Sequence, residues 1–373
     1  MQIERVEVMV VAPKVQRFTW SHDLDEQYTT NTIVRITTKD GHEGIGGVWN
    51  STSYDFDRYT CETLRHLIPA VVGQDATARE EIWKSLWPRV FPLPPQALSV
   101  IDIALWDLRG KVAGKPLYQL LGGAMDRIPS YASTPMLDDV PTYLRFIEEM
   151  IERGFTAVKF HCWCLPEKDL ELARAARKEF GDGVAFMLDA ENNYDLQSAK
   201  RVGAELGDLG FTWFEAPLFD YDLPGYRELT RSVGVPVIPS GNWLQDLTAF
   251  KHAVATQCWT AARTDVAVAG GFTGGRKYLA AAKAAGMRCE VMAWGTTLVS
   301  AANLHLMLGT GLSTYFEQAV PWEPYEYGMH DVIRAGPDGH VVAPSAPGLG
   351  VEVDWDAMEA ATIHRLDSRS LSY

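Results

Sequence analysis

The sequence predicts an α/β protein in which a (β/α)₈ barrel follows an α+β region. After Arg127, short apolar runs alternate with amphipathic helical segments at roughly 25-residue spacing, which is typical of such barrels. Before Arg127, two alternating strands are followed by a helical stretch. The 373 residues are enough for one barrel and a smaller attached domain.

The N-terminal residues 1–125 form the predicted α+β domain. VEVMVV and TIVRITT have the alternation of strands, and KDGHEG is a turn signal. Residues 14–31 are polar and aromatic without periodicity, which indicates a long loop. Residues 56–121 are helical in pattern, and LSVIDIALWDLRGKVAG predicts a helix that ends near Gly110 or Gly114.

Residues 126–320 form the predicted barrel. Parallel strands that are buried on both faces are near-continuous apolar runs, so polar residues near their C-terminal ends, where barrel active sites lie, are informative. We expect the tail, residues 321–373, to return to the N-terminal domain. The strand candidates are SYAST (130–134), TAVKF (156–160), VAFMLDA (184–190), TWFEA (212–216), VPVIPS (235–240), AARTD (261–265), MRCEVMA (287–293) and STYFEQA (313–319).

Composition excludes several classes of partner. A formal net charge of −14 and a pI of about 5.1 argue against nucleic acid and anionic lipid. No run is apolar for long enough to span a membrane, and the N-terminus does not read as a signal peptide. Five cysteines, an odd number, suggest reduced thiols in the cytoplasm. Cys162 and Cys164 lack a second thiolate pair, so we expect no metal there.

Lysine and histidine emerge together from the second barrel strand. Side chains at i and i+2 of a strand share a face, so Lys159 and His161 in AVKFH point the same way. Taken singly, Lys159 fits a lysine that reaches the barrel rim, and His161 fits a hydrogen-bonded structural imidazole. Together, at the C-terminal end of a barrel strand, they indicate proton transfer.

Oxygen donors follow at the ends of later strands: Asp189 on the third, Glu215 on the fourth, Asn242 on the fifth, Asp265 on the sixth and Glu317 on the eighth. Any one of the acidic residues also fits a helix cap or a solvated loop. Converging at one barrel mouth, hard oxygen ligands suit Mg²⁺. Such a cation would receive an anionic substrate despite the negative charge of the chain.

These motifs resemble the enolase superfamily, in particular its mandelate racemase-like branch, over nearly the whole chain. The resemblance implies an α+β capping domain over a modified TIM barrel, with cap loops within 14–31 and near 50–55 closing over the substrate. It also implies a Lys or His base and Mg²⁺. The motifs are DIALWDLRGKVAGKPLYQLLGG, VKFH, MLDAENNYD, WFEAPLFDYDLPGYREL, VPVIPSGNW, RTDVAVAGGFTGGRKYLAAAKAAGM, WGTTLVSAANLHL and PGLGVEVD.

The resemblance assigns the metal ligands and the base. Asp189 and Glu215 match the first two ligands, and Asn242 stands where the family has a Glu, so the site loses one negative charge and should hold Mg²⁺ less tightly. His161 takes the position of the base. Lys159 would bind the substrate carboxylate or lower the pKa of His161, which favours a neutral base near pH 7.

Other positions differ from the family pattern or have more than one possible role. Met292 stands where the family has a His on strand seven, so Asp265 lacks its partner in the usual His–Asp dyad and is either catalytic or structural. Glu191 is a candidate general acid, and equally fits the first turn of a helix. Glu317 matches a carboxylic acid that hydrogen-bonds the substrate.

The broken dyad favours elimination over racemisation. The hypothesis is a Mg²⁺-dependent lyase that removes the proton alpha to a carboxylate: an acid-sugar dehydratase or a cycloisomerase. A racemase or epimerase is the alternative enzyme, and a catalytically silent ligand-binding homologue is motivated by Asn242 and Met292. The resemblance to this family also implies a homo-oligomer. The candidate specificity residues are Phe18, Trp20, His22, Tyr28 and Trp49.

Overall fold

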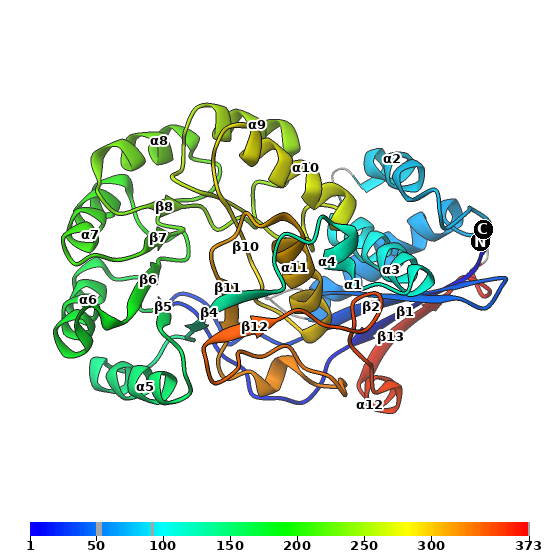
Figure 1. The fold of residues 1–373 in the computed structure, drawn as a ribbon, viewed down its shortest axis with the longest axis horizontal. Helices are drawn as coiled ribbons and strands as arrows, with labels where there is room; N and C mark the ends of the chain where they lie inside the picture. Colours follow the sequence, from blue (N-terminus) through cyan, green and yellow to red (C-terminus); the bar gives the residue numbers. More distant parts are fainter. Residues whose placement is uncertain (50–53, 91–92, 372–373) are drawn as a thin grey trace.

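A computed structural model describes residues 1–49, 54–90 and 93–371. Part of the predicted cap loop near 50–55, residues 50–53, lies outside these ranges. The chain forms a β-sheet with helices at one end and a barrel with an outer layer of helices at the other (Figure 1). Among the described residues, no helix combines the length and the apolar composition that crossing a bilayer requires.

The cap contains a four-stranded antiparallel sheet in the order β13-β1-β2-β3. The alternating patterns near the N-terminus form β1 (Ile3–Val11), β2 (Asn31–Thr38) and β3 (Glu43–Val48). The tail supplies the fourth strand, β13 (Thr362–Asp367), which pairs with β1 and lies beside it in Figure 1. The division of the chain at 125/126 and 320/321 stays a prediction.

The longest cap helix, α3 (Gln96–Ala113), is buried along most of its length and packs on β3. Glycines allow this close approach, because a Cβ at Gly44 would lie 2.2 Å from the carbonyl oxygen of Ala104. The helix ends at Gly114 with φ 63°, one of the two predicted ends. The other cap helices are α1 (Tyr54–Leu67), η1 (Ile68–Ala70), α2 (Arg79–Val90) and α4 (Leu117–Leu120).

All eight predicted barrel strands are present, though most are shorter than expected. They are β4 (Arg127–Ser133), β5 (Ala157–His161), β6 (Ala185–Asp189), β7 (Trp213–Glu215), β8 (Val237–Ile238), β9 (Ala262–Thr264), β10 (Cys289–Val291) and β11 (Phe316–Ala319). The helices around them are α5 (Val140–Glu152), α6 (Pro166–Phe180), α7 (Leu196–Asp208), α8 (Leu223–Ser232), α9 (Leu247–Ala255), α10 (Gly271–Ala284) and α11 (Thr297–Thr310), with η2 (Gly181–Gly183) after α6.

The strand pairing departs from a uniform barrel. Six strands pair in the order β11-β4-β5-β6-β7-β8, and β9 pairs with β10 as a separate unit. After β11 the chain forms the short helix η3 (Glu323–Tyr325) in place of an eighth barrel α-helix. It then returns through β12 (His340–Val342), which pairs with β4, and α12 (Trp355–Ala360) to the cap. These features fit the expected modified barrel.

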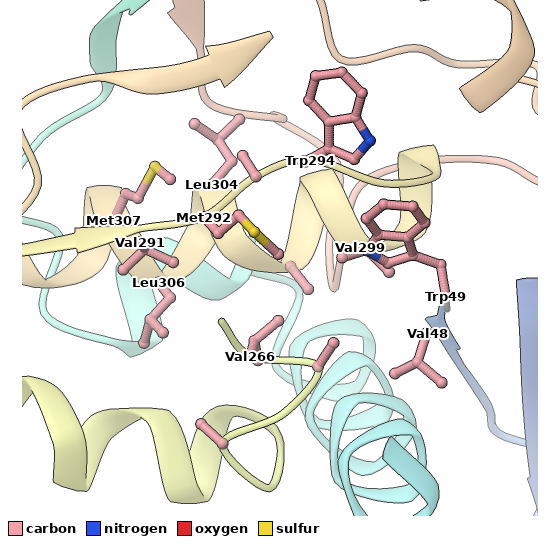
Figure 2. Close-up of a cluster of buried hydrophobic side chains, with 14 of the residues drawn as sticks. Val48, Trp49, Val266, Val291, Met292, Trp294, Val299, Leu304, Leu306 and Met307 are labelled. Carbon is pink, nitrogen blue, oxygen red and sulfur yellow. The ribbon is translucent and has the colours of Figure 1, made fainter. Parts of the chain in front are cut away.

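A hydrophobic cluster joins the cap to the barrel (Figure 2). Val48 and Trp49 from the end of β3 meet Met292 and Trp294, which follow β10, and the apolar side chains of α11. Trp49 also contacts Tyr325 edge-on, with ring centroids 6.3 Å apart. This packing fixes one cap wall over the barrel mouth.

Candidate active site

A cavity of about 220 Å³ lies at the C-terminal ends of the barrel strands, under the cap. The strand register sets its polar floor, because His161, Asp189 and Glu215 are paired neighbours at the ends of β5, β6 and β7. Seven of the eight predicted site residues line this cavity: Lys159, His161, Asp189, Glu191, Glu215, Asn242 and Glu317.

Two buried cations and two buried carboxylates form a closed ring of ion pairs in the floor. The Nζ atom of Lys159 lies 2.8 Å from Glu215 and 2.7 Å from Glu317, and Nη2 of Arg263 lies 2.9 and 2.7 Å from the same two residues. Lys159 also contacts Asp189 at 3.0 Å. These carboxylates outweigh the effect of burial and raise the pKa of Lys159, so Lys159 is a fixed ammonium and a poor candidate for the base.

Glu317 is held as an ionised carboxylate. Burial favours its neutral form, but Lys159 and Arg263 outweigh it and lower the pKa of Glu317 to about 2. One of its oxygens also accepts a hydrogen bond from Ser133 at 3.0 Å. An ionised carboxylate only accepts hydrogen bonds, and the expected donation from Glu317 to the substrate stays a prediction. Its contacts position the two cations.

The imidazole of His161 is oriented by the backbone. Its Nδ1 lies 2.5 Å from the carbonyl oxygen of Thr134, so Nδ1 carries the proton and donates it. Nε2 faces the carboxylates of Asp189 and Glu191, each at 3.3 Å. In its neutral form, His161 therefore presents the lone pair of Nε2 among the acidic residues of the site.

The predicted lowering of the His161 pKa is wrong for this structure. Burial and the Lys159 ammonium do lower it, but contacts with Asp189 and Glu191 outweigh both and raise the pKa to about 9. The sequence places Lys159 two residues from His161, so the effect of this cation could be predicted. It does not reveal that Asp189 on the next strand and Glu191 in the following turn lie close to the same imidazole.

Glu191 lies in the turn after β6 and outside any helix. The alternative that it is a first-turn helix residue is therefore excluded. Its backbone is in the left-handed region with φ 48°, and its N–H donates to Asp189 at 3.0 Å. This turn directs the Glu191 carboxylate to within 3.3 Å of His161 Nε2. Helix α7 begins later and is capped by Asp195.

Asp265 lies outside the cavity lining. It is buried, and it accepts hydrogen bonds from the side chain of Asn303 at 2.7 Å and from the backbone of Ala267 at 2.8 Å. Burial raises its pKa to about 6. Met292, at the position of the absent His, does line the cavity, and its sulfur accepts from the side-chain nitrogen of Asn242 at 3.6 Å. The structure therefore places Asp265 away from the cavity, and a catalytic or a structural role for it stays a prediction.

The donor set fits a divalent cation with oxygen ligands. Among the described residues, four carboxyl groups share this site with two permanent cations, Lys159 and Arg263; three of the four are buried and Glu191 is partly exposed. Burial raises the pKa of Glu215 to about 8, as expected where carboxylates outnumber cations. Burial raises the pKa of Glu191, as expected for such crowding. Donor atoms of His161, Asp189 and Glu191 lie within 4.8 Å of one another. A divalent cation would balance the negative charge of these carboxylates.

The cap supplies the outer wall. Trp20 and Trp49 line the cavity as predicted, whereas Phe18, His22 and Tyr28 do not. His22 instead fastens the loop to the barrel, because its Nδ1 lies 2.5 Å from the carbonyl oxygen of Trp163. The lining residues that sequence reasoning missed are Leu24, Gln27, Asn192, Ser240, Trp243 and Trp294.

Arg263 is the most important residue that sequence reasoning missed. It lies inside a short buried strand, β9, and its partners Glu215 and Glu317 are far away in the sequence. The signal that could have found it is an arginine at a barrel-strand position where a buried apolar residue is expected.

The fold and the cavity define a barrel enzyme with an acidic, cation-binding site closed by a separate cap. Residues 142–357 match the profile of the Enolase C-terminal domain-like family, and residues 5–122 match the Mandelate racemase / muconate lactonizing enzyme N-terminal domain. The chain belongs to the mandelate racemase/muconate lactonizing enzyme family of the enolase superfamily.

Curated relatives of this chain are enzymes of acid-sugar chemistry. It is 30% identical to the 3,6-anhydro-alpha-L-galactonate cycloisomerase of Streptomyces coelicolor over 87% of this chain and 89% of that one. It is 29% identical to the D-galactarolactone cycloisomerase of Agrobacterium fabrum over 77% of this chain and 81% of that one.

Solved structures show the same architecture. A Pseudovibrio sp. protein of the mandelate racemase/muconate lactonizing enzyme type is 38% identical, with a TM-score of 0.95 over 98% of both chains. A D-glucarate dehydratase from Agrobacterium tumefaciens, solved with magnesium, is 28% identical, with a TM-score of 0.83 over 98% of this chain and 100% of that one.

Proposed function

We propose that this protein is a Mg²⁺-dependent lyase that removes the proton alpha to the carboxylate of a hydroxylated sugar acid and expels a β-oxygen substituent. The reaction is that of an acid-sugar dehydratase or cycloisomerase, as in the named relatives. The observation that carries the proposal is His161, whose Nδ1 is anchored to a carbonyl and whose Nε2 faces the acidic cavity.

Asp189, Glu215 and Asn242 would hold Mg²⁺, which supplies positive charge to the substrate carboxylate and so acidifies the alpha proton. His161 Nε2 takes that proton in its neutral form, which a cation held by Asp189 would favour by offsetting the contacts that raise the pKa of His161. Glu191, 3.3 Å from Nε2, is placed to exchange a proton with His161 or with the departing oxygen. Lys159 keeps the carboxylates around the base in place.

The side of the cavity that Met292 lines, after β10, favours elimination over racemisation. A two-base racemase needs a second proton carrier on the face opposite the first. Met292, which stands at the family position of that carrier, cannot transfer a proton, and Asp265 lies outside the lining. One base on β5 is sufficient for a syn elimination, in which the same group removes a proton and then returns one.

The test is proton NMR in D₂O with Mg²⁺ over aldonates, aldarates and their lactones. We expect a 2-keto product from wild type and a loss of about 100-fold or more in His161→Asn. Asp265→Asn, outside the cavity, should retain activity if it folds. Alpha-deuterium uptake without elimination would instead indicate a racemase, and exchange that survives in His161→Asn would refute the role of this base.

We further propose a cytoplasmic homo-oligomer, divided into residues 1–125, 126–320 and 321–373. Support for a reducing compartment comes from the five cysteines, all buried and free. Light scattering of the purified protein gives the oligomeric state, and a monomeric mass would exclude the oligomer.

A further inference from the structure

The outer wall of the cavity differs in chemistry from its floor. We define the tryptophan wall as Trp20, Trp49 and Trp294, which line the cavity together with the apolar Leu24 and Met292. Trp20 and Trp294 meet edge-on with ring centroids 5.4 Å apart. Figure 2 shows Trp49 and Trp294 at the same edge of the apolar cluster that contains Met292.

The tryptophan wall begins directly beside the base. The rings of His161 and Trp294 are 5.3 Å apart and nearly perpendicular. A substrate whose alpha carbon lies near His161 Nε2 must therefore place the rest of its body against indole surface. Flat apolar surface of this kind is complementary to the C–H face of a sugar ring.

The wall offers few partners for hydroxyl groups. Beside it, the cavity lining offers the polar side chains of Gln27, Asn192, Ser240 and Asn242, and the wall itself has only indole N–H groups, of which those of Trp20 and Trp294 have no hydrogen-bond partner in the described part of the chain. Trp20 is 7% exposed. Such a buried donor is costly unless a ligand supplies an acceptor. An open polyol would bring more hydroxyls into the cavity than the wall can pair.

The wall also lacks a partner for a second carboxylate. Among the described residues that line the cavity, Lys159 is the only lysine or arginine, and three carboxylates already surround it. A carboxylate at the far end of an aldarate would thus be buried without a counter-ion, which is strongly unfavourable.

We propose that the substrate is a ring-form acid sugar with a single carboxylate, held with its ring against the tryptophan wall and accepting a hydrogen bond from Trp20. The inference rests on the proposed function and selects cycloisomerisation within it. His161 removes the proton from the alpha carbon, a C=C bond forms, and the bond from the β-carbon to the ring oxygen breaks. In an anhydro sugar acid the ring oxygen leaves as an alkoxide that takes a proton. In a lactone it leaves as a carboxylate, and because the wall offers that carboxylate no counter-ion, the product dicarboxylate is released. The enol becomes a 2-keto acid, an isomer of the substrate.

Two matched pairs of compounds test the proposal. 3,6-Anhydrogalactonate and galactonate differ by ring closure, which removes two hydroxyls, and galactarolactone and galactarate differ by a ring and one carboxylate. We expect kcat/KM for each ring form to exceed that of its open partner by about 100-fold. Equal or faster turnover of the open forms would overturn the ring inference and leave the elimination chemistry standing.

A binding measurement keeps the inference testable if no compound is turned over. Tryptophan fluorescence of His161→Asn with Mg²⁺ should report binding of the two ring forms at least about tenfold tighter than that of their open partners. Equal affinities would overturn the proposal. Failure of turnover in wild type, with the ring preference intact in binding, would instead refute the proposed reaction alone.

A pair of variants isolates the indole N–H. Trp20→Phe keeps an aromatic face and removes the donor, so kcat/KM for the ring forms should fall about tenfold. Trp322→Phe is the matched control, because its indole N–H also lacks a partner in the described chain and it lies outside this cavity. If both variants behave like wild type, Trp20 does not donate to the substrate.

Discussion

Replacing Arg263 with methionine should destabilise the protein strongly through the ring of ion pairs. Arg263 is 2% exposed and contacts Glu215 at 2.9 Å and Glu317 at 2.7 Å. Arg263→Met leaves both carboxylates facing the single Lys159 ammonium. Removing one partner of a buried pair costs about 3–5 kcal/mol, since the remaining charge is uncompensated. We expect a loss of that size in the free energy of unfolding, measured by urea titration.

A second substitution tests whether charge is the cause. Arg263→Met combined with Glu317→Gln removes one cation and one carboxylate, so the double variant should recover about 1–3 kcal/mol of the loss. Arg174→Met is the control, because Arg174 pairs with Glu205 on the surface and should cost less than about 1 kcal/mol. A cost for Arg263→Met no larger than this control, or strictly additive losses in the double variant, would refute the reasoning.

Three further predictions follow. Asn242→Glu should tighten Mg²⁺ binding about tenfold in calorimetry, because it adds a charged ligand, and unchanged affinity would show that residue 242 does not coordinate. Gly295→Ala should cost about 1–3 kcal/mol in unfolding, because φ is 138° and a Cβ would lie 2.7 Å from Trp49 Nε1; a neutral effect would contradict this contact. The imidazole of His305 accepts from the Tyr118 N–H and donates to the Leu349 carbonyl, and burial lowers its pKa to about 4. Between pH 6.5 and 4 the unfolded chain therefore binds a proton that the folded protein does not, so up to about 3 kcal/mol of stability is lost as pH falls, and His305→Gln should flatten that part of the stability profile.

The barrel could be predicted because its signal is local. Each strand is a short apolar run, and His161, Asp189 and Glu215 interrupt the pattern where their strands end. Strand lengths were less predictable, since β8 keeps only Val237–Ile238 of a six-residue run. Hydrogen bonding to neighbours sets that length, and it is not visible in a single segment.

The electrostatics of the site could not be predicted because they depend on non-local pairs. The raised pKa of His161 comes from Asp189 and Glu191, which only the parallel pairing of β5 with β6 and the turn after β6 bring close. The same holds for Arg263 and Glu317, which are 54 residues apart in the sequence. Sequence reasoning found the residues of the site but not its charge balance.

The pairing of β13 with β1 sets the order in which this protein can mature. In the sheet order β13-β1-β2-β3, β1 is synthesised long before β13, so one edge of β1 stays free until residues 362–367 emerge from the ribosome. The segments of the barrel are all synthesised during that interval. The cap walls of the cavity, Trp20 and Trp49, therefore rest on a sheet whose edge is completed only after every strand of the barrel has been synthesised.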